Sequence, residues 1–417
     1  MNKRTLNCFY DLSIAPCSYD FFAFLISAEL HRIRNKFSSL AVVFLPGPNN
    51  GYRQDNLRTF QQNDNFFKNV LLNAPLLYQS CSSIVWLNSR VEALNYLQNP
   101  DNIFPRGYSL DNSITDYLYH GIVASYFRGD QPVFFQSPDY ARDLAKSLFG
   151  KIASDRRFIT LTTRELLRDD PGTRRIDINF WESFFSGLDK SKFQPLIIRD
   201  TSVAVCSEPL FKNVPEIPAA SIHLHMRYAI YQESFLNIFK PNGPSILSSY
   251  GTTPNLFFFE ANNNLCAISN DWYQTHYGMS TGSQFPLTTK NKRLIWGKEN
   301  LTAIEQTISL LETSEEDLGL QRYPITDSDT LRYTTKVALM HTLQNLRYGV
   351  LEEDVQVLRV YKDLLLKGLV SGPQPNELIE DHEAKNIFSK NTWDKIMHFD
   401  AISKSILGEK SKVYQVG

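Results

Sequence analysis

The sequence contains few cysteines, and none of them are spaced to bind a metal. The 417 residues include five scattered cysteines: Cys8, Cys17, Cys81, Cys206 and Cys266. An odd number of cysteines without a C-x-x-C motif indicates neither a disulfide framework nor a zinc knuckle. Reduced thiols are typical of a cytoplasmic protein, which is the location that we expect.

Long apolar runs are also missing. No apolar stretch approaches the roughly 20 residues that cross a bilayer. Near the start of the chain, the apolar run after Arg4 is broken by Asn7 and Asp11 and lacks the core of a signal peptide. We therefore expect no transmembrane segment, and any membrane contact to be peripheral.

The chain has almost no net charge. Lys and Arg number 43 and Asp and Glu number 44, which gives a formal net charge of -1. No overall field therefore attracts nucleic acid, and we expect no nucleic-acid partner. An anionic ligand has to be bound by a local site.

Several catalytic and metal-binding motifs are absent from the sequence. It contains no HExxH, DxD, Walker A or GxSxG motif. His223 and His225 have no third metal ligand nearby in the sequence, so we predict that they are buried or capping side chains and that the protein has no metal site. The small residues from Gly278 to Gly282 follow no clear strand and are a weak candidate for a phosphate loop.

The first part of the chain alternates strands and helices. Parallel sheets with right-handed crossovers are built from this alternation. The pattern defines a predicted first Rossmann-like domain, 1–152. Its predicted elements are a strand over Thr5–Tyr10, a helix from Ser18, a strand over Ser39–Leu45, a helix over Phe66–Leu77, a strand over Ser83–Leu87 and a helix over Ile114–Tyr126.

The alternation then restarts and defines a predicted second Rossmann-like domain, 153–295. Its predicted elements are strands over Arg157–Thr163, Phe193–Ile198 and Asn255–Glu260, helices over Asn179–Leu188 and Ile222–Phe239, a short helix at Ser245, and an irregular segment over Tyr273–Arg293. Residues 296–417 form a predicted helical C-terminal region, with helices over Asn300–Glu312, Thr330–Leu346, Glu353–Gly368 and Thr392–Leu407. The predicted fold class is therefore α/β, with two Rossmann-like domains that face a cleft and a helical C-terminal region.

Polar residues at the ends of the second domain's strands are candidates for binding an anion. Ligands of doubly wound folds bind beyond the carboxyl ends of the strands. Arg164 and Glu165 follow the domain's first strand, and a guanidinium there can hold phosphate oxygens in a bidentate fork. The alternative is that the two residues form a surface pair or a bridge between domains.

The turn Asn242-Gly243-Pro244-Ser245 is a second candidate for anion binding. Glycine permits close approach of the backbone, and a helix that begins at proline presents free amides to a diphosphate. Ser245 adds a hydroxyl donor. The alternative is an ordinary turn before a helix.

Side chains of the helix predicted over Ile222–Phe239, which precedes this turn, could complete the anion-binding site of the second domain. Arg227 and Tyr231 share a helix face at i,i+4 spacing. Glu233 could accept hydrogen bonds from a ribose diol, as an acidic residue does in dinucleotide folds. A structural pairing of these charges across the helix is the alternative.

In the first domain, the two notable carboxylates are Asp11 and Asp20. Asp11 ends the first strand, where it is predicted to face the cleft and to act as the base that deprotonates an acceptor hydroxyl. Ser18, Tyr19 and Arg53 are predicted to lie on the same acceptor side. A turn or N-cap role for Asp11 is the alternative.

The order of these segments resembles that of bacterial GT-B-type glycosyltransferase-like proteins of surface-polysaccharide biosynthesis. The resemblance covers roughly Leu6 to Glu260. It rests on CFYDL, SYDFFAFLISAEL, VVFLPGPNNGYR, FITLTTRE, the helix with Trp181, PLIIRDT, R-x-A-x-Y and NGP. It implies metal-independent transfer from a nucleotide-sugar, bound as a substrate with no other cofactor, to a glycan or glycolipid acceptor. It also implies that the first domain, 1–152, lies on the acceptor side and the second domain, 153–295, on the nucleotide-sugar side.

Two other functions fit the same sequence. One is a catalytically inactive, nucleotide-binding scaffold whose helical region recruits a partner. The other is a nucleotide-sugar epimerase, which would need the donor and no acceptor.

Overall fold

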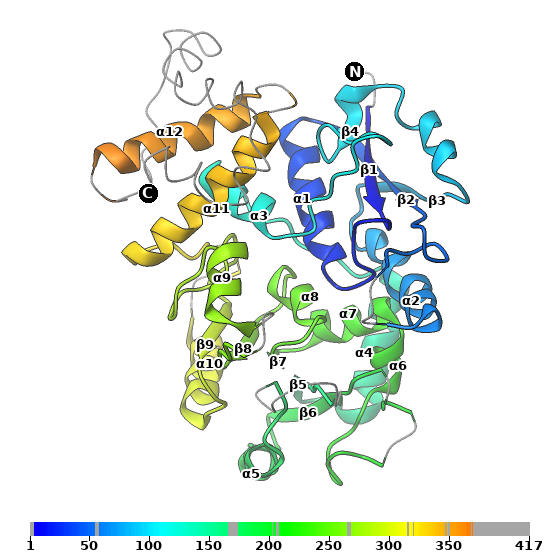
Figure 1. Ribbon diagram of the computed structural model, residues 1–417. Coiled ribbons are helices and arrows are strands. Elements are labelled where there is room, and N and C mark those ends of the chain that lie inside the picture. Colours follow the sequence, from blue (N-terminus) through cyan, green and yellow to red (C-terminus); the bar gives the residue numbers. More distant parts are fainter. Residues whose placement is uncertain are drawn as a thin grey trace.

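The computed structural model describes residues 4–54, 58–165, 174–201, 203–205, 208–264, 268–314, 317–319, 321–346, 348, 351–367 and 369. Within these residues the chain forms two α/β domains and a pair of long C-terminal helices, α11 (Ser328–Leu346) and α12 (Glu352–Leu366). Figure 1 shows the first domain above the second, with α11 and α12 beside the first domain. The predicted α/β fold class, with two parallel sheets and a helical C-terminal part, is confirmed.

The first domain is built on a parallel sheet of four strands in the order β3-β2-β1-β4. The strands are β1 (Thr5–Asp11), β2 (Ser39–Leu45), β3 (Cys81–Trp86) and β4 (Ile103–Phe104). The helices are α1 (Phe21–Arg34), α2 (Phe60–Phe66), α3 (His120–Phe127), the π-helix η1 (Phe67–Leu71) and the 3-10 helices η2 (Ala74–Leu77), η3 (Arg90–Asn95) and η4 (Pro100–Asn102). Nearly every residue of β2 is buried because helices or loops cover both faces of a parallel sheet.

The second domain contains a parallel sheet of five strands in the order β6-β5-β7-β8-β9. The strands are β5 (Arg157–Thr162), β6 (Phe193–Ile198), β7 (Leu236–Phe239), β8 (Asn255–Phe259) and β9 (Lys292–Trp296). Two of them correct the sequence prediction. β7 lies where we predicted the end of a helix, and β9 begins inside the segment that we predicted to be irregular. A short buried apolar strand such as LNIF cannot be distinguished from part of a buried helix by periodicity.

The described helices around the second sheet are α4 (Asp139–Ala153), α5 (Ile178–Gly187), α6 (Pro218–Ile222), α7 (Leu224–Glu233), α8 (Ser245–Ser249), α9 (Asn270–His276) and α10 (Leu301–Thr313). α4 packs on α7, and Phe149 of α4 stacks on Phe158 of β5 with ring centroids 3.8 Å apart. Ala303 and Ile304 of α10 belong to the core under the same sheet. The second domain therefore includes α4 and α10, which lie outside the range 153–295 that the sequence predicted.

The two sheets share one continuous apolar core. Phe135, in the connection between the domains, lies edge-on to Phe22 of α1 at 5.5 Å and to Tyr228 of α7 at 6.2 Å. The hydroxyl of Tyr228 also donates a hydrogen bond to the carbonyl oxygen of Phe135 at 2.5 Å. Apolar packing thus holds the domains against each other on one side of the cleft.

The C-terminal helices return to the first domain. α11 packs on α3, and α12 packs on both α11 and α3. Val337, Ala338 and Val357 form an apolar cluster with Val123 and Ala124 of α3. The predicted helix over Thr392–Leu407 lies outside the described residues.

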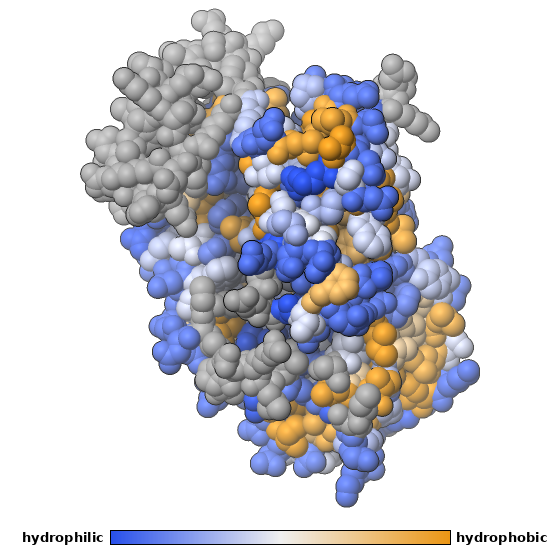
Figure 2. Space-filling model, turned by 45° about the vertical axis from the view of Figure 1, so that its right-hand side comes forward, coloured by the Kyte–Doolittle hydropathy of each residue, from blue (hydrophilic) through white to orange (hydrophobic). Residues whose placement is uncertain are grey.

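On the face shown in Figure 2, apolar residues form separate patches among hydrophilic ones. The exposed large apolar side chains of the first domain include Trp86, Val91 and Leu94. None of the helices in the described part of the chain is long and apolar enough to cross a bilayer.

We predict that Gly107→Ala weakens the attachment of the C-terminal helices. Gly107 has φ +77°, and a Cβ there would lie 2.0 Å from Cδ1 of Tyr348. Gly129→Ala is a matched control, since Gly129 has φ +76° and no atom within 4 Å of the added Cβ. Both variants should lose about 1 kcal/mol of unfolding free energy to backbone strain. Gly107→Ala should lose about 1–3 kcal/mol more to overpacking in chemical denaturation. Equal losses of unfolding free energy in the two variants would show that the contact with Tyr348 does not affect stability.

Candidate active site

A polar pocket of about 180 Å³ lies where the two domains meet. We call it the interdomain pocket. The first domain contributes Tyr19, Asp20 and Tyr119, from the segments that follow β1 and β4. The second domain contributes Arg164, Arg174, Pro241, Asn242, Gly243, Ser245, Ile246, Ser249, Tyr250, Phe257, Ile268, Tyr273, Tyr277 and Phe285.

The strand order explains why the pocket forms here. In the first sheet β1 lies between β2 and β4, and in the second sheet β5 lies between β6 and β7. In each sheet, the segment after the central strand (β1 or β5) and the segment after its later neighbour (β4 or β7) therefore run to opposite faces of the sheet. Such a switch in strand order leaves a crevice in which doubly wound proteins bind ligands. Here the crevices of the two sheets face one another.

The turn after β7 lines the pocket, but its amides are not free. Ser245 N donates to Asn242 Oδ1 at 2.9 Å, and Leu247 N donates to the carbonyl oxygen of Pro244 at 3.1 Å. α8 is one short turn of five residues. These bonds occupy amides at the start of α8 that we expected to bind a diphosphate. Asn242 Nδ2 is buried without a hydrogen-bond partner among the described residues.

Gly243 brings the two domains into contact. A Cβ on this residue would lie 2.4 Å from Cδ2 of Tyr19, so no larger residue fits without displacing the ring. The sequence placed Tyr19 and Gly243 on opposite sides of a cleft, and the structure brings them together. Pro244, the next residue, is the N-cap of α8 and does not line the pocket.

Arginine supplies positive charge to the pocket. Arg164, predicted from its position after β5, lines it together with Arg174, which the sequence analysis missed. Glu165 points elsewhere: its carboxylate pairs with Arg199 at 2.5 Å and accepts from Thr163 Oγ1 at 2.8 Å. This pairing joins the ends of β5 and β6, so Glu165 is not placed to bind a ligand in the pocket.

Asp20 is the one carboxylate that lines the pocket within the described part of the chain. The residue is exposed, and partial desolvation of its carboxylate by neighbouring protein atoms raises the pKa of Asp20. Ser18 Oγ donates to Asp20 Oδ2 at 2.6 Å and opposes the pKa shift, as do the charges of Arg53 and Arg58. Ser18 and Arg53 thus act on Asp20, and neither of them lines the pocket.

Asp11 does not face the pocket, which corrects the prediction of its role. The carboxylate is fully buried and receives a bidentate pair from Arg90, with Nη1–Oδ1 at 2.6 Å and Nη2–Oδ2 at 2.7 Å. Tyr108 and Ser13 also donate to it. Although burial alone raises the pKa of Asp11, these hydrogen bonds lower it to about 2. A carboxylate so occupied is a poor proton acceptor.

The two charged residues predicted on α7 also lie outside the pocket. Arg227 is buried behind it and donates to Tyr231 Oη at 3.2 Å and to the carbonyl oxygen of Ser221 at 3.0 Å. Glu233 accepts from Arg142 Nε of α4 at 3.0 Å. Both residues thus have structural partners, although Glu233 pairs with a residue of α4 and not across its own helix as the alternative had it.

The histidines have the structural roles that the sequence predicted. His223 Nδ1 accepts from Met226 N at 3.3 Å and caps α7. The buried His225 contacts Tyr140 Oη at 2.6 Å and the carbonyl oxygen of Asn73 at 2.8 Å. The described part of the chain contains no group of three His, Cys, Asp or Glu side chains that could hold a metal ion.

Aromatic residues that the sequence analysis did not identify form a wall of the pocket. Tyr119 and Tyr277 come from different domains, and their ring centroids lie 4.0 Å apart. Tyr273 of α9 stacks on Tyr277, the residue that follows α9, with ring centroids 4.9 Å apart. This i,i+4 aromatic pair was the available signal, but the segment was predicted to be irregular.

Comparison with known proteins shows no close relative. A scan against protein-family models and a search of curated proteins find no match. Among solved structures, the chain is similar to a glycosyl transferase of family 9 from Veillonella parvula, with 10% identity and a TM-score of 0.41 over 81% of this chain and 99% of that one.

Two further structures are similar at the same level. The Escherichia coli ADP-heptose LPS heptosyltransferase II shares 9% identity, with a TM-score of 0.41 over 74% of this chain and 98% of that one. The fucosyltransferase NodZ from Bradyrhizobium shares 11%, with a TM-score of 0.35 over 60% and 94%. At these values the similarity is no evidence for a shared activity, so the function has to be argued from the pocket.

We predict that Asp11→Asn destabilises the protein in a pH-dependent way. Because the pKa of Asp11 falls from 3.8 in the unfolded chain to about 2, the ionised group contributes stability above pH 4 and loses it as the pH falls toward 2. This contribution is about 2 kcal/mol. The difference in unfolding free energy between wild type and variant should shrink over that range in denaturant titrations. A difference that is constant with pH would contradict the pairing with Arg90.

Proposed function

We propose that the protein is a glycosyltransferase that moves a sugar from a nucleotide-sugar donor to a glycan or glycolipid acceptor. The observation that carries this proposal is the interdomain pocket, in which one carboxylate from the first domain shares a cavity with two arginines from the second. An inverting transfer of a sugar uses a base beside the acceptor hydroxyl and positive charge beside the leaving diphosphate. The base acts on the acceptor, and the cations act on the leaving diphosphate.

Asp20 is the base in this proposal. Its carboxylate accepts the proton of the acceptor hydroxyl as that oxygen forms a bond to the anomeric carbon. The bond from that carbon to the diphosphate oxygen breaks in the same step, and the pair of electrons leaves with the nucleoside diphosphate. A single displacement of this kind inverts the anomeric centre. The raised pKa of Asp20 makes it a better proton acceptor than an ordinary surface carboxylate.

Arg164 and Arg174 stabilise the leaving diphosphate. Guanidinium groups hold phosphate oxygens in a fork, and Asn242 Nδ2 adds a neutral donor that no described residue occupies. Since these side chains supply positive charge, we expect transfer without a metal ion or other cofactor. We also expect a cytoplasmic location, where nucleotide-sugars are available, with any membrane contact being peripheral.

The size of the pocket determines which part of the donor it holds. Pockets that enclose a drug-sized ligand measure about 300–1,000 Å³. The interdomain pocket has about 180 Å³. It is therefore expected to hold the junction of diphosphate and sugar, while the nucleoside extends beyond it. The aromatic wall of Tyr119 and Tyr277 provides an apolar face for the sugar ring.

We expect Asp20→Asn to reduce transfer by about 10²–10⁴-fold, because the amide cannot accept the proton. In the wild type, the raised pKa of Asp20 should place the acidic fall in kcat/KM above the usual range of a carboxyl group, since only the ionised form accepts a proton. The measurement is initial rate against pH with a panel of nucleotide-sugars and acceptors. A variant that keeps wild-type kcat would remove Asp20 from the chemistry. Product formed without any acceptor would instead indicate epimerisation.

We expect Arg164→Ala to weaken nucleotide binding. Loss of one charge-assisted contact should reduce the thermal stabilisation by nucleoside diphosphates and raise their Kd by about tenfold or more. Glu233→Gln is the matched control, since Glu233 pairs with Arg142 outside the pocket and should leave Kd unchanged. Absence of stabilisation of the wild type by every nucleotide and nucleotide-sugar tested would refute the donor site.

A further inference from the structure

A second pocket of about 320 Å³ lies between the first domain and the C-terminal helices. We call it the C-terminal pocket. Ile14 from the segment after β1 lines it, as do Arg106 and Asp116 from the segment after β4. α11 closes it with His341 and Asn345, and α12 with Glu353. It lies beside α1, on the side where α3 and the C-terminal helices pack.

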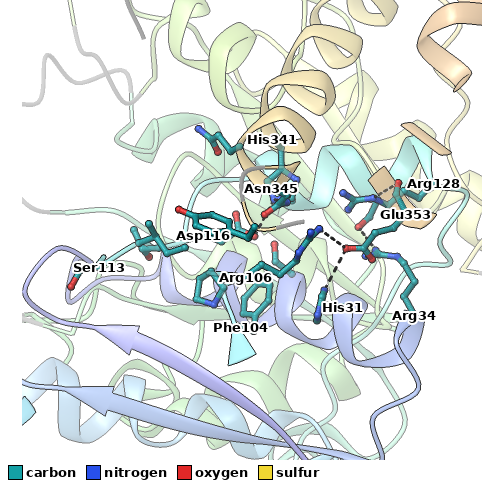
Figure 3. A pocket seen from close by; sticks show the side chains of 18 of the residues that line it. His31, Arg34, Phe104, Arg106, Ser113, Asp116, Arg128, His341, Asn345 and Glu353 are labelled. Atoms are coloured by element: carbon teal, nitrogen blue, oxygen red, sulfur yellow. Dashed lines mark hydrogen bonds and ion pairs between the residues drawn. The ribbon is translucent and has the colours of Figure 1, made fainter. Parts of the chain in front are cut away.

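One end of this pocket is rich in charges that cancel. Figure 3 shows His31, Arg34, Arg106 and Arg128 gathered around Glu353. Arg34 pairs with Glu353 and with Asp130, and Arg106 pairs with Asp354 at 2.8 Å. The three arginines are thus matched by three carboxylates, so this end has no excess charge with which to attract an anion or a cation.

The middle of the pocket has mixed donors and acceptors. Asp116 Oδ2 lies 3.4 Å from His341 Nε2, and Asn345 Nδ2 lies 3.3 Å from His341 Nδ1. The ring of Phe104 provides an apolar wall beside them. Carboxylate, amide and imidazole groups next to an aromatic ring are complementary to the hydroxyls and the C–H face of a sugar.

Three lining side chains have buried polar atoms without a hydrogen-bond partner among the described residues: Ser27 Oγ, Thr115 Oγ1 and Arg128 Nη2. Arg128 Nη2 does have an ion-pair partner, since it lies 4.0 Å from Asp354 Oδ1. The Arg128 side chain is 3% exposed. Buried polar atoms are nearly always hydrogen-bonded, and leaving one unpaired costs about 1–3 kcal/mol. Rotation of the Ser27 and Thr115 hydroxyls toward the pocket would let a polar molecule there remove this cost.

We propose that the C-terminal pocket binds an uncharged sugar ring, which is a unit of the acceptor glycan remote from the reacting hydroxyl. The balanced charges disfavour an ionic ligand, and the unpaired hydroxyls and the Asp116 group suit vicinal diols. The volume is at the lower end of the range of small-molecule sites, which fits one or two rings. The identity of the sugar as part of an acceptor rests on the proposed transferase function, but the binding of a neutral sugar does not.

The test is direct binding to the full chain without any donor. Titration calorimetry and saturation-transfer NMR would use glucose, galactose, mannose, rhamnose and N-acetylglucosamine, with glucuronate and glucose 6-phosphate as charged counterparts. At least one neutral sugar should bind saturably, and its charged counterpart should bind about tenfold more weakly or worse. Asp116→Asn and Thr115→Val should each raise Kd severalfold, while Asp139→Asn, at a side chain 96% exposed elsewhere, should not.

The outcomes separate this proposal from that for the interdomain pocket. Arg164→Ala should leave sugar binding unchanged, because Arg164 lines the other pocket. If the sugar is an acceptor unit, Asp116→Asn also raises the acceptor KM with donor KM and kcat unchanged; if a free sugar is the occupant, the acceptor KM stays the same. If Asp116→Asn lowers the melting temperature, Thr115→Val, which removes only one hydroxyl, tests sugar binding in its place. Lack of saturable binding by every neutral sugar, or binding that both variants leave intact, would overturn the proposal and indicate a water-filled cavity.

Discussion

The contact between Gly243 and the ring of Tyr19 sets how closely the two domains approach. A side chain at position 243 would overlap the ring, so the turn after β7 can reach the segment after β1 only with glycine. Asp20 is the next residue after Tyr19, and Asn242 immediately precedes Gly243. The same contact therefore places a carboxylate of one domain opposite the amide and guanidinium groups of the other. The chemistry proposed for the pocket depends on how closely these groups of the two domains approach each other.

Two carboxylates of one short segment have opposite properties because of their surroundings. The ion pair with Arg90 and the hydrogen bonds from Tyr108 and Ser13 keep the Asp11 carboxylate ionised and give it a structural role. Asp20 has Ser18 as its hydrogen-bond donor and faces the pocket, where desolvation raises its pKa. The surroundings of each carboxylate, rather than its position at a strand end, thus determine its properties. The buried Asp11 fixes the segment that carries Asp20.

Local sequence patterns predicted a large part of the fold. The apolar run of β2, the strand-end position of Arg164 and the turn at Gly243 were all recognisable, because each depends on neighbouring residues. The partners of Asp11 were not recognisable, since Arg90 and Tyr108 lie 79 and 97 residues away in the sequence. Glu233 was assigned to a ligand for the same reason, because its partner Arg142 belongs to a helix that the sequence analysis did not identify. β7 was missed because four apolar residues have no distinguishing period.

The return of the C-terminal helices to the first domain means that the chain crosses between the domains twice. The first crossing runs from α3 to α4, and the second from α10 to α11. The two crossings are joined, since Arg322 Nη1 of the second donates to the carbonyl oxygen of Asp130 in the first at 2.9 Å. Nearby, Ile325 N donates to Tyr126 Oη at 3.1 Å. Two crossings joined in this way restrain the twisting of one domain against the other more than a single connection would.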